Sequence, residues 1–119
     1  MRRVYVAGAY SSDTTIGTLT NIRKGMRLAT EVMLAGYATF CPWFDHQVVF
    51  QLRDGEELDK EHYQQQSIAW LEVCHAVLLV PGWENSGGTN REIAIAEGLC
   101  MPIFESLEEL KGHFNAMEE

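Results

Sequence analysis

An acidic residue, Glu92, lies near the start of a largely apolar helical stretch in the segment PGWENSGGTNREIAIAEG, residues 81–98. The order Thr89-Asn90-Arg91-Glu92 matches a capping box, in which a threonine and a glutamate three residues later satisfy the free backbone N–H groups of a helix start. The apolar residues that follow predict a buried helix, which would place Glu92 at the floor of a crevice. A carboxylate there can act as a nucleophile or accept a hydrogen bond from a ligand hydroxyl. Capping and chemistry therefore both remain open.

The same segment offers a place for an anion. Residues 86–89, SGGT, lead from a strand end into the helix, and glycines there let a ligand approach free backbone N–H groups. We expect Ser86 and Gly88 to contact substrate, with Arg91 adding positive charge, although a plain glycine-rich turn explains the same residues. Neither a Walker loop nor a dinucleotide fingerprint is present in the sequence.

Aromatic residues lie at three predicted strand ends. Tyr5 could orient a carboxylate through its hydroxyl, and Tyr10 follows shortly after the same strand; ordinary packing is the competing interpretation for a strand tyrosine. Trp43 and Trp83 each follow a strand end, where an indole can stack on a base or close the rim of the core.

Three further titratable residues are candidates for acid–base work. Asp45 and His46 form a possible acid–base pair on a loop, although sequence neighbours need not touch. His75 precedes the third predicted strand, and its ring can carry a proton near neutral pH. A structural role is the alternative for all three.

The elements that would position these residues alternate between strand and helix. Apolar runs at residues 4–8, 37–41, 76–82 and 101–104 predict strands, and helical spacing predicts helices over residues 21–35, 59–74 and 106–117. This alternation indicates a small doubly wound, Rossmann-like or flavodoxin-like α/β domain with a mostly parallel sheet in three layers. We expect residues 4–7, 39–40 and 76–80 to be its central strands. The long connection over residues 42–58 is typical of a functional lid.

Composition narrows the function further. The 119 residues suit a single domain, residues 1–119, and the net charge of −8 argues against a nucleic acid polymer as partner. The cysteines lack metal-ligand spacing and predict buried free thiols. Because no stretch is long and apolar enough to span a membrane, we expect a cytoplasmic protein without a membrane partner.

The chain resembles the nucleoside 2-deoxyribosyltransferase-like superfamily, in particular its small bacterial and phage members of unassigned function. The resemblance covers residues 4–104 and rests on VYVAGAYS, NIRKGMRLATEVMLAGYATFCP, CHAVLLVPGWENSGGTNREIAIAEGL and MPIF. It implies that Glu92 attacks the anomeric carbon, that Tyr5 hydrogen-bonds this nucleophile, and that Gly8 lets the sugar approach the backbone. It also implies that Ser86 and Gly88 hold a 5′-hydroxyl or 5′-phosphate.

Two positions depart from that pattern. Where the family usually has aspartates, this chain has Ser67 and His75. Leaving-group chemistry then falls to another residue, such as His75 or Asp45, or the site binds a nucleotide without cleaving it.

We therefore expect a protein that cleaves or exchanges the N-glycosidic bond of a nucleoside or nucleoside 5′-monophosphate, with catalytic residues Glu92, Tyr5 and His75. The alternative is a non-catalytic nucleotide-binding module that senses or sequesters its ligand. No metal or cofactor is expected. Because relatives complete their sites with a neighbouring subunit, we also expect a homodimer or a higher homo-oligomer.

Overall fold

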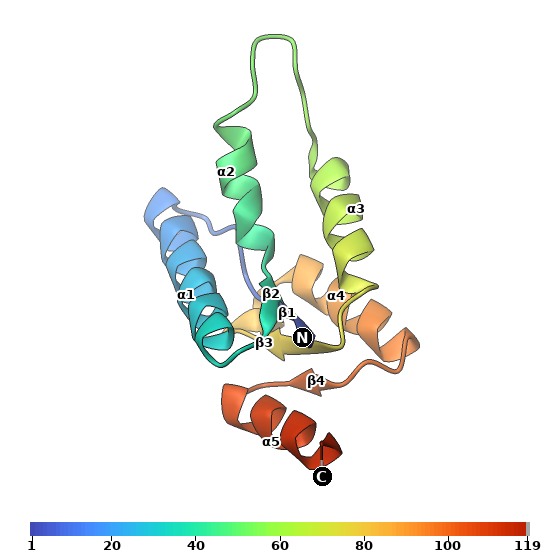
Figure 1. Ribbon diagram of the computed structural model, residues 1–119. Helices are drawn as coiled ribbons and strands as arrows, with labels where there is room; N and C mark the ends of the chain where they lie inside the picture. Colours follow the sequence, from blue (N-terminus) through green and yellow to red (C-terminus); the bar gives the residue numbers. More distant parts are fainter. Residues whose placement is uncertain (119) are drawn as a thin grey trace.

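The computed structural model describes residues 1–118 and contains a four-stranded, all-parallel sheet (Figure 1). Its strands are β1 (Arg3–Ala7), β2 (Ala38–Phe40), β3 (Ala76–Leu79) and β4 (Ile103–Phe104). Their order across the sheet is β2-β1-β3-β4. The prediction of a doubly wound α/β domain is confirmed, but β2 is wrongly predicted as central. It forms one edge of the sheet, because the chain reverses its direction of winding after β2 and places β3 on the far side of β1.

The two central strands, β1 and β3, are the most apolar. Val4, Tyr5, Val6 and Ala7 are all fully buried, and each pairs with a residue of β3, from Ala76 to Leu79. A parallel strand covered on both faces reads as a continuous apolar run, and both strands do. Side chains of alternate residues then enter opposite layers of the core.

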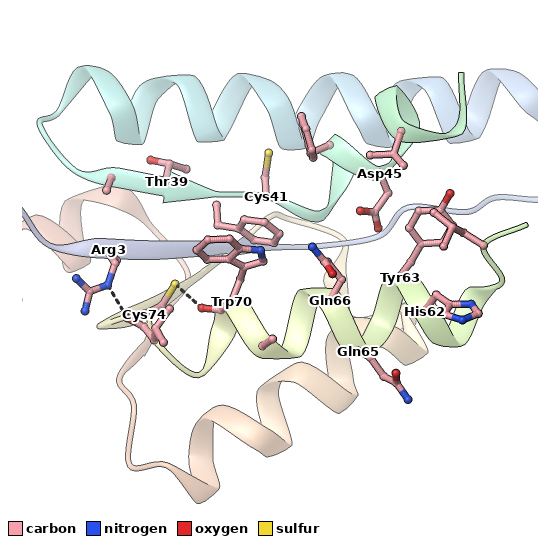
Figure 2. A pocket seen from close by; sticks show the side chains of 17 residues that line it. Arg3, Thr39, Cys41, Asp45, His62, Tyr63, Gln65, Gln66, Trp70 and Cys74 are labelled. Atoms are coloured by element: carbon pink, nitrogen blue, oxygen red, sulfur yellow. Dashed lines mark hydrogen bonds between the residues drawn. The ribbon is translucent and has the colours of Figure 1, made fainter. Parts of the chain in front are cut away.

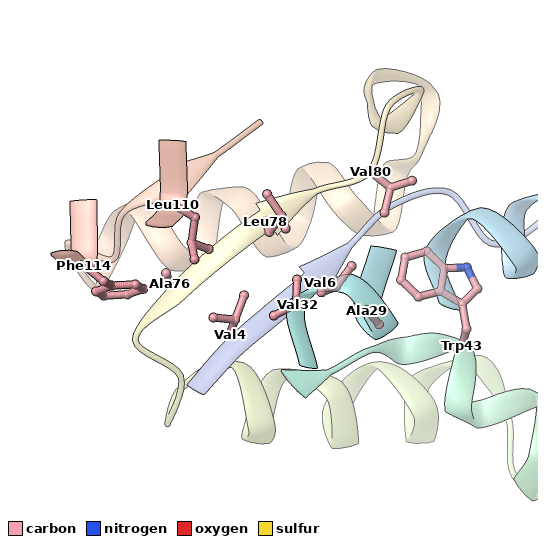
Figure 3. Packing of buried hydrophobic residues seen from close by; sticks show 10 residues of the cluster. All are labelled: Val4, Val6, Ala29, Val32, Trp43, Ala76, Leu78, Val80, Leu110 and Phe114. Atoms are coloured by element: carbon pink, nitrogen blue, oxygen red, sulfur yellow. The ribbon is translucent and has the colours of Figure 1, made fainter. Parts of the chain in front are cut away.

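Helices cover both faces of the sheet. Val4, Val6 and Leu78 pack with α1 (Thr15–Leu34) and α5 (Leu107–Met117) on one face (Figure 3). Tyr5 and Leu79 pack with α3 (Lys60–Leu71) and α4 (Gly87–Gly98) on the other. No helix within residues 1–118 is long and apolar enough to cross a membrane.

The first helix begins at Thr15 rather than at residue 21 as expected. Thr14 caps it by accepting a hydrogen bond of 2.9 Å from the Gly17 N–H. Threonines and a glycine are weak helix formers, which hid this turn from a periodicity argument. Gly25 is explained by a close contact, because a Cβ at this position would lie 2.4 Å from the ring of Trp43.

The predicted long connection forms an arm that stands away from the sheet (Figure 1). It contains a short 3₁₀ turn, η1 (Pro42–Phe44), then α2 (Asp45–Val49), a loop, and the first turns of α3. A capping box lies at the start of α3, where the side chains of Asp59 and His62 each accept a hydrogen bond from the other's backbone N–H. With the arm the molecule measures 53 × 26 × 24 Å.

The cysteines only partly match their prediction. All three are free thiols, and Cys41 and Cys74 are partly buried, but Cys100 is exposed. Cys100 lies in the exposed turn after α4, with a φ of 57°.

Candidate functional site

A cavity of about 990 Å³ opens where the carboxyl ends of β1 and β3 meet. This is the point at which the strand order reverses, where doubly wound sheets bind their ligands. Its wall comes from the loop after β1, the start of α2, one face of α3 and the first turns of α4. Of the predicted site residues, it brings together Gly8, Tyr10, Asp45, Ser86, Gly88, Arg91 and Glu92.

Glu92 lines the cavity and contacts Tyr5 of the central strand β1. The hydroxyl of Tyr5, a fully buried side chain of β1, donates a hydrogen bond to Glu92 Oε2. Burial raises the pKa of Glu92 to about 8, because a carboxylate loses its hydration there. The resemblance implied this pairing of tyrosine and glutamate, and the sheet register produces it by turning the Tyr5 side chain toward the α4 face.

The start of α4 corrects the capping prediction. The N-cap is Ser86, which accepts a hydrogen bond of 3.2 Å from the Thr89 N–H, and the helix begins at Gly87. Thr89 is buried and donates its hydroxyl to Ser86 Oγ at 2.9 Å. A capping box between Thr89 and Glu92 is therefore wrong, because Glu92 lies in the second turn. Because Glu92 does not cap the helix, capping gives no reason for a glutamate at this position.

The apolar helix α4 is also less buried than expected. Ala96 is fully buried against the sheet, whereas Ala94 and Leu99 are exposed. The helix packs one face only, so its apolar character does not by itself place Glu92 in the interior. Glu92 is half-buried where it contacts Tyr5.

The positively charged groups of the cavity lie on α3 and in the first turns of α4, and we refer to them as its cationic end. An added Cβ at Gly87 or Gly88 would meet nothing within 4 Å among residues 1–118, so the N–H groups at the start of α4 are open to a ligand. Arg91 and Lys60 line the same cavity. Arg91 Nη1 donates to Gln64 Oε1 at 2.7 Å, which fixes the guanidinium against α3.

A second carboxyl group, Asp45, lines the cavity from the start of α2. Burial raises its pKa to about 6. Burial also raises the pKa of Tyr10, and the nearby Asp45 and Tyr63 raise it further. The hydroxyl oxygen of Tyr63 is buried and has no hydrogen-bond partner among the described residues.

Tyr63 was missed as a site residue by sequence reasoning. Its helical spacing with Ser67 is that of a core-facing stripe, and both residues do share one face of α3. Both residues line the cavity. A polar pair at the head of an otherwise apolar stripe was the available signal.

The two tryptophans belong to the framework. Trp43 is only 2% exposed, packs in the core, and donates its indole N–H to the Ala9 carbonyl at 3.2 Å (Figure 3). Trp83 packs against the α4 face of the core and donates to Glu105 Oε1 at 3.3 Å. Of the two interpretations left open, closing the core rim fits these positions, and stacking on a base does not. Gly8 serves the same packing, since a Cβ there would lie 2.7 Å from Val80 Cβ.

The two histidines lie away from Glu92. His46 packs edge-to-face on Phe50 within the arm. His75 precedes β3 and accepts a hydrogen bond of 2.8 Å from the Arg3 N–H, at the amino end of the sheet and therefore opposite to the cavity. Burial and the nearby arginines lower its pKa. Neither position supports a role in protonating a leaving base.

A second, more apolar cavity of about 900 Å³ lies between the edge strand β2 and α3 (Figure 2). Phe40 and Trp70 stack along it with ring centroids 5.8 Å apart. Asp45 and Tyr63 line this cavity as well as the first, so the two cavities meet at these residues.

The site offers two carboxyl groups of different pKa, one buried hydroxyl free to bind, and a cationic end. Within residues 1–118, no group of three histidine, cysteine, aspartate or glutamate side chains is placed to hold a metal ion. The chemistry that these residues support is proton transfer and nucleophilic attack by a carboxylate.

Comparison with known proteins gives a family without an assigned activity. No curated protein matches the chain. A family model described as "Domain of unknown function (DUF4406)" matches residues 2–105, which include both cavities' main residues from Tyr5 to Glu92. The chain belongs to the DUF4406 family.

Proposed function

We propose that this protein cleaves or exchanges the N-glycosidic bond of a nucleoside or nucleoside 5′-monophosphate, with Glu92 as the nucleophile. The observation that carries the proposal is the Tyr5–Glu92 hydrogen bond at a cavity on the switch point of the sheet. The volume suits a small molecule, since such sites measure about 300–1,000 Å³. The proposal draws also on the sequence resemblance to nucleoside 2-deoxyribosyltransferase-like proteins.

The mechanism assigns each group one task. The Glu92 carboxylate attacks the anomeric carbon as the bond to the base breaks, and a glycosyl ester results. Water, or a second base, then attacks the same carbon and releases Glu92. The Tyr5 hydroxyl orients the carboxylate and stabilises its charged form by donating to it. Because the pKa of Glu92 is about 8, the reactive carboxylate becomes more abundant as the pH rises toward 8.

The cationic end of the cavity favours a phosphorylated substrate. A protein with a net charge of −8 repels anions overall, so a phosphate needs local positive charge. Arg91, Lys60 and the free N–H groups at Gly87 and Gly88 supply it. We therefore propose that a 5′-monophosphate is preferred over the corresponding nucleoside.

The test is a panel of nucleosides and nucleoside 5′-monophosphates, with release of the free base followed by chromatography at pH 8. We expect base release from at least one 5′-monophosphate, with a higher kcat/KM than from its nucleoside. Binding of panel nucleotides, measured by calorimetry, without release of base from any of them would contradict the proposal.

A non-catalytic nucleotide-binding module is the second candidate. One observation favours it: Glu92 keeps its proton at neutral pH, and a protonated carboxyl group is a hydrogen-bond donor rather than a nucleophile. A site of this kind would bind a nucleotide through the same hydroxyl and phosphate contacts. The panel separates the two candidates, because only an enzyme releases base.

We also propose that the active form is a homodimer whose interface covers the arm and the apolar cavity. A folded monomer of this mass exposes about 6,500 Å², whereas this chain exposes 7582 Å². Six of the exposed large apolar side chains gather on α2, α3 and the segments between and beside them: Phe44, Val49, Phe50, Leu58, Trp70 and Val73. A surplus of about 1,000 Å² is close to the surface that each partner buries in a stable interface.

Light scattering at micromolar concentration checks this expectation. We expect a mass near twice 13.5 kDa, and we expect Trp70→Glu to reduce it because a carboxylate would have to be buried in the interface. A mass of one chain for the parent protein would refute the dimer.

A further inference from the structure

We propose that Asp45 is the acid that donates a proton to the departing base, and that the Tyr63 hydroxyl holds the base beside it. This inference rests on the proposed function and assigns the leaving-group chemistry of the same site. It replaces His75, which lies at the other end of the sheet.

The position of Asp45 relative to Glu92 is the first support. Glu92 lines the cavity from α4, and Asp45 lines it from the start of α2, so the two carboxyl groups enter one space from different elements. Attack on one face of the anomeric carbon requires the base to leave from the opposite face. An acid carried by a different element from the nucleophile is compatible with that requirement.

The Tyr63 hydroxyl is the second support. It is buried, yet among residues 1–118 it has no hydrogen-bond partner, although a buried hydroxyl ordinarily has one. Tyr63 and Asp45 line both cavities, and Figure 2 shows the Asp45 side chain extending from α2 toward α3, where Tyr63 lies. A heterocyclic base placed at this junction would give the orphaned hydroxyl its partner and would meet the Asp45 carboxyl group.

The surroundings of Asp45 keep it able to hold a proton. Partial burial raises its pKa to about 6, and no histidine or arginine is among the groups that shift it. The titratable and charged groups around it come from several elements: Tyr10 and Asp13 after β1, Cys41 after β2, Lys60, His62 and Tyr63 on α3, and Arg91 and Glu92 on α4. Glu92, when it ionises, adds negative charge to the same cavity and favours the protonated form of Asp45 further.

The proton and electron pairs balance over the two half-reactions. In the first, Glu92 forms a bond to the anomeric carbon, the electron pair of the glycosidic bond moves to the base nitrogen, and the Asp45 proton is transferred to the base. In the second, the Asp45 carboxylate takes a proton from water while the water oxygen bonds to the anomeric carbon and the ester bond to Glu92 breaks. Asp45 ends protonated and Glu92 ends ionised, as both began.

The experiment compares two leaving groups in the intact protein. One substrate is the panel nucleotide with the highest turnover, and the other is 4-nitrophenyl β-D-ribofuranoside 5-phosphate, whose nitrophenolate leaves without a proton. We expect Asp45→Asn to lower kcat on the nucleotide by about 100-fold or more, the size of a lost general acid. On the nitrophenyl substrate we expect a change within about threefold, because no proton donor is needed there.

The pH profiles give a second readout. The nucleotide reaction needs Glu92 ionised and Asp45 protonated, so kcat/KM of the parent protein should stop rising near pH 6 and should fall above pH 8. The nitrophenyl reaction needs only ionised Glu92, so its kcat/KM should continue to rise to about pH 8. In Asp45→Asn, the weak nucleotide reaction should also rise to about pH 8.

Control measurements distinguish the loss of a proton donor from a damaged fold and from failure of the proposed function. Asp54→Asn, in the exposed loop of the arm, is the matched control and should leave both reactions unchanged. Asp45→Glu should restore part of the nucleotide reaction, and Tyr63→Phe should raise KM more than it lowers kcat. Equal losses on both substrates for Asp45→Asn would overturn the assignment. If the parent protein cleaves neither substrate, the proposed function fails and the acid assignment fails with it.

Discussion

Replacing Glu92 with glutamine is expected to reduce base release by at least about a thousandfold while nucleotide binding survives. The amide cannot trap the anomeric carbon, and it lacks the charge that stabilises an oxocarbenium-like transition state. It keeps an acceptor oxygen for the Tyr5 hydroxyl, so the local hydrogen bond is retained. Turnover is measured by chromatography of the free base, and binding is measured by calorimetry with the same nucleotide.

The matched control for this variant is Glu97→Gln. Glu97 lies on the same helix but is exposed, and it should lose no activity when its charge is removed. Full activity in Glu92→Gln would leave the glutamate as a ligand contact only, and its assignment as the nucleophile would then be wrong.

The same buried glutamate should make folding stability depend on pH. The pKa of Glu92 is about 8 in the folded protein and is ordinarily 4.5, so the folded state holds a proton that the unfolded state has released between these values. Stability from this group is therefore fully present below pH 4.5 and is lost as the pH rises through about 8. The rise in pKa corresponds to a loss on the order of 4–5 kcal/mol across that window.

Thermal or urea unfolding of the parent protein and Glu92→Gln at several pH values isolates this effect. Groups that do not interact with Glu92 titrate equally in both proteins, so the difference between their free energies of unfolding reports on Glu92 and on its coupling to Asp45. We expect the variant to gain stability relative to the parent as the pH rises from 5 to 8.5. A constant difference over that range would mean that Glu92 is not desolvated in the folded protein. A gain in stability together with a loss of activity is typical of a side chain kept for chemistry.

Much of the fold follows from the sequence because its central strands are covered on both faces. Residues 4–7 and 76–79 must be apolar throughout, and such runs are easy to recognise. The edge position of β2 is a property of how the chain winds between elements, which no local pattern records. The start of α1 could not be predicted for another reason. Its first turn consists of weak helix formers and is stabilised by the side-chain cap from Thr14.

The candidate site was only partly accessible from sequence. Ser86, Gly88 and Glu92 follow one strand end and lie at the cap and in the first two turns of one helix, so their grouping can be read along the chain. The cap at Ser86 was misassigned to Thr89 because several residues of SGGT can cap a helix, and the first turn decides between them. His75 was misplaced because strand direction puts it at the amino end. Tyr63 was missed because its importance depends on an unpartnered hydroxyl that exists only in three dimensions.

The most direct test of the account is to trap the bond between Glu92 and the sugar. A nucleoside 5′-monophosphate with fluorine at C2′ slows formation and release of the glycosyl ester, because fluorine destabilises the oxocarbenium-like transition state. We expect intact-mass measurement after incubation with it to show one added fluoropentosyl phosphate on the parent protein, located by peptide mapping at Glu92, and none on Glu92→Gln. Release of base without any adduct at Glu92, or an adduct that persists in Glu92→Gln, would contradict the account.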